Sequence, residues 1–84
     1  MPQWFLWTVM AQTQLSAIDR VEAKRILDAI ARLRLGQGDI KPMKGYKPPA
    51  KRLKVGAYRV VYREAGDGRF EILRVGLRAT VYKD

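Results

Sequence analysis

The chain has 84 residues, with 17 Lys and Arg against 8 Asp and Glu, and a formal net charge of +9. It contains no cysteine and no histidine, which excludes disulfides, thiolate metal sites, cysteine nucleophiles and proton transfer by imidazole. The length predicts a single domain over residues 1–84 with a small core. The charge indicates a polyanionic partner, and the absence of cysteine fits a reducing cytoplasm, where we expect the protein to act.

The N-terminal third predicts a strand followed by two helices. The apolar run at residues 4–11 is shorter than the roughly 20 residues of a membrane helix, and it lacks the flanks of a signal peptide. We expect a strand over residues 4–7 and a helix that Thr8 caps and that extends to about residue 17. Asp19 and Glu22 form a capping-box pattern for a second helix, which Gly36 and Gly38 end.

The rest of the chain predicts a loop and three strands. Pro48, Pro49 and Gly45 indicate a loop over residues 41–51. Strands are expected over residues 51–55, 57–64 and 69–77, with a hairpin turn at residues 65–68 and one more edge pairing from residues 79–84. This order predicts an α+β fold with an N-terminal strand, a two-helix hairpin and an antiparallel β-meander. The helices would pack on one face of a mostly antiparallel sheet.

Alternation along the three strands separates apolar residues from cations. Strand side chains point to opposite faces in turn, so Leu53, Val60, Leu73 and Val75 are expected to face the helices. The same alternation assigns Phe70 and Ile72 to the second face. The cations expected on that face are Arg52, Lys54, Arg59, Arg63, Arg74 and Arg78.

A sheet face that only resists edge pairing needs charge of either sign. The second face instead collects one lysine and five arginines with no expected acid among them. Arginine suits planar, bidentate phosphate recognition. We therefore favour phosphate binding over an ordinary solvated face.

Three motifs resemble the RelE/ParE toxin superfamily, the toxin halves of bacterial type II toxin–antitoxin pairs. They are MKG at residues 43–45, RLKVGAYRVVYRE at residues 52–64 and ILRVGLRATVY at residues 72–82. The resemblance extends over nearly the whole chain and implies the RelE-like fold. In this superfamily, RelE-like members are endoribonucleases that cut mRNA in the ribosomal A site, and ParE-like members poison DNA gyrase.

The resemblance also implies a set of functional residues. By motif, the catalytic positions of the RelE-like branch correspond to Lys54, Arg59, Arg78 and Tyr82, and Arg52 stands where that branch carries lysine. Arg59 and Arg78 would hold the phosphate, while Lys54 and Tyr82 would share the acid and base roles in an order that stays open. The other expected RNA contacts are Arg52, Arg63, Arg74, Lys41, Lys44, Lys47 and Lys51.

Three interpretations follow for the function. The first is a ribosome-dependent endoribonuclease that works by metal-independent attack of the RNA 2′-OH, needs no cofactor, and is neutralised by a cognate antitoxin in a hetero-oligomer. The second is a gyrase inhibitor without catalytic chemistry. The third is an inactive member that only binds its antitoxin, which the Arg52 replacement keeps open. Two alternative roles also stay open: Lys54 could be a solvated strand lysine, and Tyr82 could be a core side chain.

Overall fold

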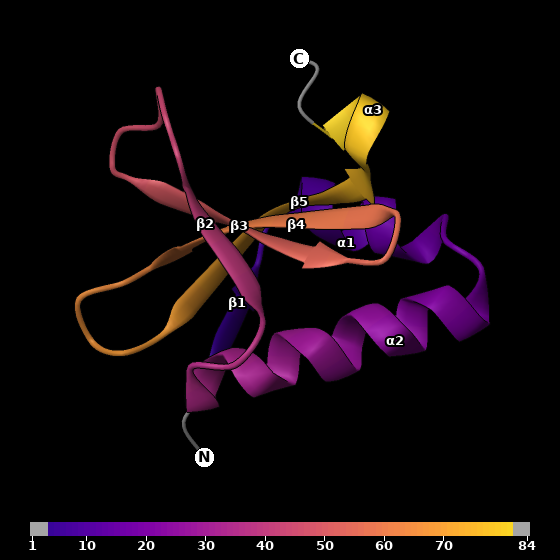
Figure 1. Ribbon diagram of the computed structural model, residues 1–84, viewed down its shortest axis with the longest axis horizontal. Helices are drawn as coiled ribbons and strands as arrows, with labels where there is room; N and C mark the ends of the chain where they lie inside the picture. Colours follow the sequence, from indigo (N-terminus) through magenta and orange to yellow (C-terminus); the bar gives the residue numbers. More distant parts are fainter. Residues whose placement is uncertain (1–3, 82–84) are drawn as a thin grey trace.

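The computed structural model describes residues 4–81 and contains one five-stranded sheet with helices on both of its faces (Figure 1). The strand order is β1-β5-β4-β3-β2, with β1 parallel to β5 and the other neighbours antiparallel. This confirms the predicted α+β class. Along the chain the elements are β1 (Phe5–Trp7), α1 (Val9–Ser16), α2 (Arg20–Ala31), the 3₁₀-helix η1 (Arg32–Leu35), β2 (Asp39–Met43), β3 (Ala50–Val55), β4 (Tyr58–Glu64), β5 (Phe70–Leu77) and α3 (Arg78–Val81).

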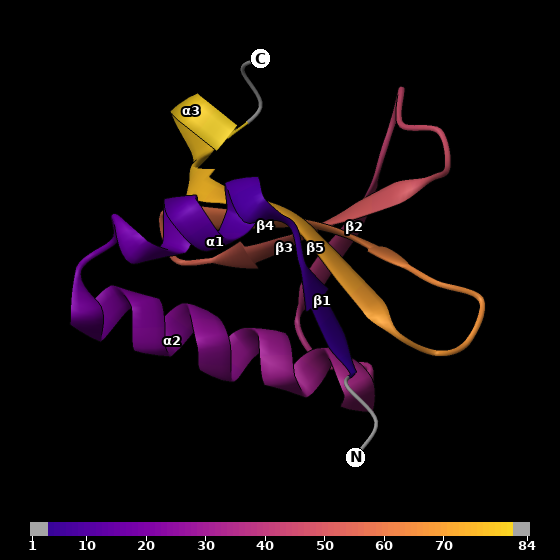
Figure 2. The ribbon, with the colours of Figure 1, turned by 180° about the vertical axis from the view of Figure 1, so that it is seen from behind.

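The main core lies between the sheet and the helices α1 and α2. Ala11 of α1 and Ile26 and Ile30 of α2 pack against buried strand residues that include Val60 and Ile72. Figures 1 and 2 show α2 along this face and α3 on the opposite one. Across residues 4–81, no helix is long and apolar enough to cross a membrane.

The helix ends follow the predicted caps. The Thr8 hydroxyl accepts a hydrogen bond from the Ala11 N–H at 3.0 Å and donates to the Leu73 carbonyl at 2.9 Å, so one side chain begins α1 and joins it to β5. Asp19 caps α2 by accepting from the Val21 N–H at 3.1 Å. After α2 the chain continues as η1 and stops at Gly36, whose φ of 71° is left-handed.

Two expected elements differ from the structure. The predicted loop over residues 41–51 is wrong at its start, because Asp39–Met43 forms β2 and pairs with β3. Pro42 fits there because β2 is an edge strand and needs no N–H on its open side. The expected edge pairing after residue 79 is also wrong for the described residues, because the segment begins with α3, whose Val81 is buried against Ala50 and Val61.

A β-bulge in β5 changes which residues face the helices. Val61 pairs with Arg74, but the next residue, Tyr62, pairs with Ile72, so Leu73 is an extra residue. The alternation therefore shifts by one residue at this point. Phe70 and Ile72 lie in the main core instead of on the second face, and Leu73 packs against the small cluster under α3 instead of facing α1 and α2.

Candidate functional site

Strand register brings charged residues into two rows across the second face of the sheet. Antiparallel neighbours lie only about 5 Å apart, so side chains in one row are close in space. The first row is Asp39, Lys54, Arg59 and Gly76, and the second is Lys41, Arg52, Val61 and Arg74.

A pocket of about 420 Å³ opens over these rows. We call it the cation pocket, and its lining residues are Asp39, Lys41, Arg52, Lys54, Arg59 and Arg78. Five of the six are cations, and they come from β2, β3, β4 and α3. All five cations were expected from the sequence as catalytic or RNA-binding residues.

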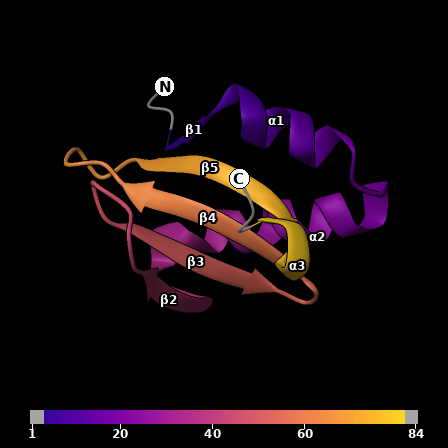
Figure 3. The same ribbon diagram turned by 90° about the horizontal axis from the view of Figure 1, so that it is seen from above.

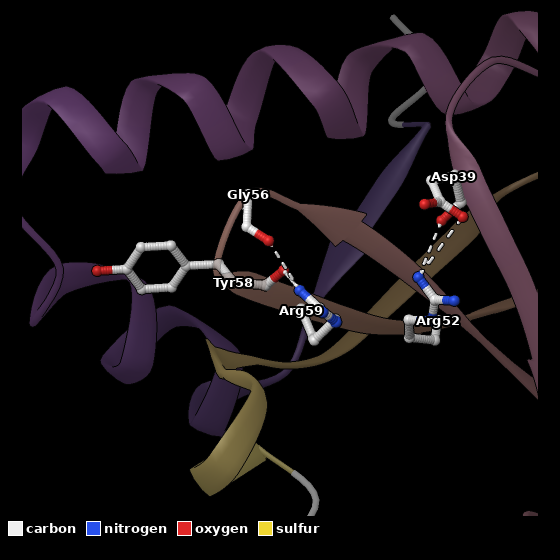
Figure 4. A network of polar contacts seen from close by, with 5 residues as sticks. All are labelled: Asp39, Arg52, Gly56, Tyr58 and Arg59. Atoms are coloured by element: carbon white, nitrogen blue, oxygen red, sulfur yellow. Dashed lines mark hydrogen bonds and ion pairs between the residues drawn. The ribbon is translucent and has the colours of Figure 1, made fainter.

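Arg59 is fixed by the turn between β3 and β4. Its Nη1 donates to the carbonyl oxygens of Gly56 and Tyr58, each at 2.9 Å (Figure 4). Gly56 is the first residue of this two-residue turn and has a φ of 59°, the conformation that a type II′ hairpin requires there. A guanidinium has five N–H donors, so these bonds position Arg59 and still allow it to bind an anion.

Arg78 is tied to the same turn from the other side. Its backbone N–H donates to the Ala57 carbonyl at 3.2 Å, which sets the start of α3 beside the turn. Burial of Val81 then holds the end of α3 against the sheet. The positions of Arg59 and Arg78 therefore depend on one hairpin turn.

Arg52 and Asp39 form the opposite wall of the cation pocket. Arg52 Nη1 lies 3.7 Å from Asp39 Oδ1 and donates to the Asp39 carbonyl at 3.4 Å (Figure 4). The Arg52 side chain is only 13% exposed, whereas that of Asp39 is 55% exposed. Asp39 thus orients Arg52 and presents a carboxylate to the pocket.

Asp39 was not predicted as a site residue, and the expected absence of acids on this face is wrong. Asp39 lies opposite Lys54, and the bulge places Glu71 opposite Arg63. The signal for Asp39 was the alternation of charged and apolar residues in DIKPM, residues 39–43, which the proline concealed.

Two arginines of the second face lie outside the cation pocket. Arg63 Nη1 is 3.4 Å from Glu71 Oε1, and Arg63 Nη2 donates to the Pro48 carbonyl at 3.3 Å. Arg74 Nη1 donates to the Val81 carbonyl at 3.5 Å and so supports α3. An RNA contact by either residue stays a prediction.

The remaining predicted residues are more scattered. Lys51 Nζ lies 3.0 Å from Glu64 Oε2, and Lys44 and Lys47 are exposed in the connection between β2 and β3. Tyr82 lies outside the described residues. The roles predicted for these four residues are untested by the fold.

The cation pocket combines two chemical capacities. Clustered Arg and Lys donors can bind a phosphodiester and stabilise additional negative charge on it. A carboxylate and an ammonium at the same place can exchange protons with a substrate. Transesterification of RNA uses the RNA's own 2′-OH as the nucleophile. A protein therefore needs only phosphate-binding groups and one pair of proton-transfer groups to promote it.

Comparison with known proteins identifies the family. Residues 5–82 match the family described as the ParE toxin of the type II toxin–antitoxin system parDE. The chain belongs to this family and hence to the RelE/ParE superfamily, as the three motifs predicted. No curated protein matches the sequence closely enough to add to this assignment.

Solved structures share the fold. A chain of the RelB–RelE antitoxin–toxin complex from Methanococcus jannaschii is 27% identical with a TM-score of 0.74, covering 92% of this chain and 94% of that one. A chain of the RelE–RelB complex from Pyrococcus horikoshii is 20% identical with a TM-score of 0.73, covering 96% and 100%. A chain of the RelBE2 toxin–antitoxin complex from Mycobacterium tuberculosis is 25% identical with a TM-score of 0.64, covering 93% and 100%.

Proposed function

We propose that this toxin is an endoribonuclease that cleaves mRNA bound in the ribosomal A site. The observation that carries the proposal is the cation pocket, in which five cations surround one exposed carboxylate. A surface that only bound a protein partner would not need this convergence of phosphate-binding and proton-transfer groups. The similarity to the RelE–RelB structures adds support.

The proposed reaction needs no metal. The RNA 2′-oxygen attacks the adjacent phosphorus, the bond from phosphorus to the 5′ oxygen breaks, and the products are a 2′,3′-cyclic phosphate and a 5′-hydroxyl. One proton leaves the 2′-OH and one reaches the 5′ oxygen, so the protons balance. The protein must accept the first, supply the second and stabilise the extra charge on phosphorus.

The cation pocket suggests a group for each task. Arg59 and Arg78 bind the non-bridging oxygens and stabilise the developing charge. The Asp39 carboxylate accepts the 2′ proton, and Lys54 donates a proton to the 5′ oxygen. Lys54 suits this position because its Cα pairs with both Asp39 and Arg59 across the sheet. We keep Tyr82 as a second proton-transfer group in the proposal.

We also propose that a cognate antitoxin neutralises the toxin in a hetero-oligomer in the cytoplasm. Two of the structural neighbours come from complexes of RelE with RelB. A net charge of +9 would attract a partly disordered acidic segment that orders on binding. Such a segment would cover the cation pocket and prevent RNA from entering it.

The test of the proposed activity compares ribosome-bound with free mRNA. Purified ribosomes are programmed with a defined message, the protein is added, and cuts are mapped by primer extension. We expect cuts in the A-site codon and little cleavage of free message. Folded protein that leaves the bound message intact would disprove the proposal.

The second candidate is inhibition of DNA gyrase, which the match to the ParE family specifically favours. In that case the cation pocket would bind without chemistry. A supercoiling assay with purified gyrase separates the two, because only the second candidate predicts loss of supercoiling. A protein inactive in both assays that still binds an antitoxin would be the inactive member that the Arg52 replacement suggests.

A further inference from the structure

A second pocket, of about 330 Å³, lies between α2 and the end of β3, where β3 extends past β2. We call it the β3-edge pocket. Its apolar lining residues are Ala29, Leu53 and Val55, and its cations are Arg25, Arg32 and Lys54. Figure 3 shows that β3 extends past the end of β2 and that α2 lies behind the sheet.

The turn after η1 fixes one wall of this pocket. The Gln37 N–H donates to the Arg32 carbonyl at 3.2 Å, and the Gly36 N–H donates to the Leu33 carbonyl at 3.0 Å. These two bonds are those of a Schellman motif, which ends a helix in a defined conformation. Gln37 and Gly38, which also line the pocket, are therefore held in place next to Arg32 without a ligand.

The two pockets meet at Lys54, which lines both of them. A chain that placed one phosphate in the cation pocket could therefore continue around the β3 edge into the β3-edge pocket. Arg25 and Arg32 would meet it there, although Arg25 also lies 3.7 Å from Glu22.

The composition of the β3-edge pocket fits a nucleotide better than an anion alone. Ala29 is only partly buried and, with Leu53 and Val55 beneath it at 1% and 7% exposed, gives the pocket an apolar floor. Guanidinium planes such as that of Arg32 can stack on unpaired RNA bases or bind their phosphates, and a side-chain amide such as that of Gln37 can bond to base edges. A purely electrostatic surface would not need the apolar lining.

We propose that the β3-edge pocket binds one nucleotide of single-stranded RNA next to the nucleotide whose phosphate occupies the cation pocket. This inference rests on the proposed function in taking RNA as the substrate. It assigns Arg32 and Gln37 as binding residues that hold the substrate without taking part in the reaction.

The test measures binding of uncleavable RNA to the isolated protein. Fully 2′-O-methylated oligonucleotides cannot react, because the 2′ oxygen is blocked. Oligonucleotides of one to four nucleotides, extended separately at the 5′ or the 3′ side, are titrated at low salt by fluorescence anisotropy. Wild type should gain about 10-fold in affinity at the single extension that reaches the β3-edge pocket, the lower part of the range for one base held on a protein surface.

Two arginine variants separate the contribution of this pocket to RNA affinity from that of general charge attraction. Arg32→Ala should abolish the 10-fold gain, while Arg20→Ala should keep it. Arg20 is exposed at the first position of α2, about 18 Å from Arg32 along a helical axis, and loses the same charge. Gln37→Ala, at an exposed site, should reduce the gain without changing the charge.

Each outcome decides the inference. The inference is overturned if Arg32→Ala and Arg20→Ala behave equally, if the affinity increases smoothly with RNA length, or if RNA of no length binds. Because these RNAs cannot be cut and no ribosome is present, the result is independent of the cleavage assay. A protein that shows the 10-fold gain but never cuts mRNA would refute the proposed function and still support nucleotide binding by the β3-edge pocket.

Discussion

Two guanidinium groups of the cation pocket, those of Arg52 and Arg59, are oriented by protein oxygens before any substrate arrives. Arg59 is held by the carbonyls of Gly56 and Tyr58, and Arg52 by Asp39. Donors fixed in advance need no reorganisation when charge develops on a bound phosphate, which is how electrostatic stabilisation accelerates a reaction. Substituting lysine for either arginine would remove this fixed, planar arrangement.

Asp39→Asn tests the proposed base. The change keeps the size of the side chain and an oxygen for Arg52, but removes the group that accepts the 2′ proton. We expect mRNA cleavage to fall by at least about 10²-fold. Binding of uncleavable RNA should be unchanged or tighter, because a negative charge leaves the pocket.

The control for this variant is Glu64→Gln, which removes an exposed carboxylate that pairs with Lys51 outside the cation pocket. It should cleave like wild type. If Asp39→Asn also cleaves within a few-fold of wild type, Asp39 is not the base, and Lys54 and Tyr82 become the pair to examine.

Tyr62 gives the fold a pH dependence at high pH. Its side chain is 1% exposed, and burial together with the nearby Glu64 carboxylate raises the pKa of Tyr62 to about 12 from 10.0. Between these two values the unfolded chain releases the phenolic proton and the folded chain keeps it. The unfolding free energy should therefore fall by about 2–3 kcal/mol as pH rises from 10 to 12.

Tyr62→Phe removes only this contribution. Urea unfolding at several pH values between 9 and 12 should show a smaller loss of stability for the variant than for wild type. Every other titratable group is the same in the two proteins, so its contribution cancels in the comparison. An identical loss in the two proteins would show that the buried phenol does not titrate as stated.

The cations of the pocket could be predicted from sequence, but its carboxylate could not. Arg52, Lys54 and Arg59 lie in strands whose strict alternation assigns each side chain to a face. Asp39 reaches the pocket only through the pairing of β2 with β3. That pairing is non-local, and Pro42 made the segment resemble a loop.

At the scale of elements, irregular features shape both pockets. The turn from η1 to β2 builds the β3-edge pocket, and α3 carries Arg78 to the cation pocket. The bulge at Leu73 was not predictable from alternation, because an extra residue changes pairing without leaving a local pattern. The strands other than β2, the helix caps and the hairpin turns were predictable, since each depends on neighbours in sequence.

Gly38→Ala tests the rigidity of the turn before β2. Gly38 has a φ of 128°, and an added Cβ would lie 2.7 Å from Leu53 Cδ1. Leu53 is buried in the core, so we expect the variant to lose about 1–3 kcal/mol of unfolding free energy in urea.

Gly66→Ala is the matched control, because its backbone is not left-handed and an added Cβ would meet no atom within 4 Å. It should be as stable as wild type or slightly more stable. Equal stability of the two variants would mean that the turn adjusts freely and does not hold the β3-edge pocket.

At the scale of the molecule, charge is distributed unequally between the two faces. Figure 3 shows α3 on one face of the sheet and α2 on the other. The cation pocket lies on the α3 face, and the main core lies on the α2 face. The net charge of +9 attracts RNA in general, whereas the cation pocket concentrates donors for a phosphate around a carboxylate. General attraction and local chemistry should therefore respond differently to salt and to mutation.

The salt dependence of RNA binding measures the contribution of general charge attraction to the affinity. If three or more cations contact phosphates, the logarithm of the RNA association constant should fall with that of salt concentration with a slope of about −2 or steeper. Anisotropy titrations with uncleavable RNA between 50 and 200 mM salt, roughly the range where such losses are large, provide the slope. A flat response would exclude phosphate contacts as the source of affinity.

The most direct test of the account is cleavage of ribosome-bound mRNA by wild type, Arg78→Ala and Arg69→Ala at equal concentration. Arg69 is an arginine of the hairpin between β4 and β5, paired with Asp67 at 3.2 Å and outside the cation pocket. The account predicts A-site cuts by wild type and Arg69→Ala, and a rate about 10²–10³-fold lower for Arg78→Ala. Equal cleavage by all three proteins would contradict the assignment of the cation pocket as the catalytic site.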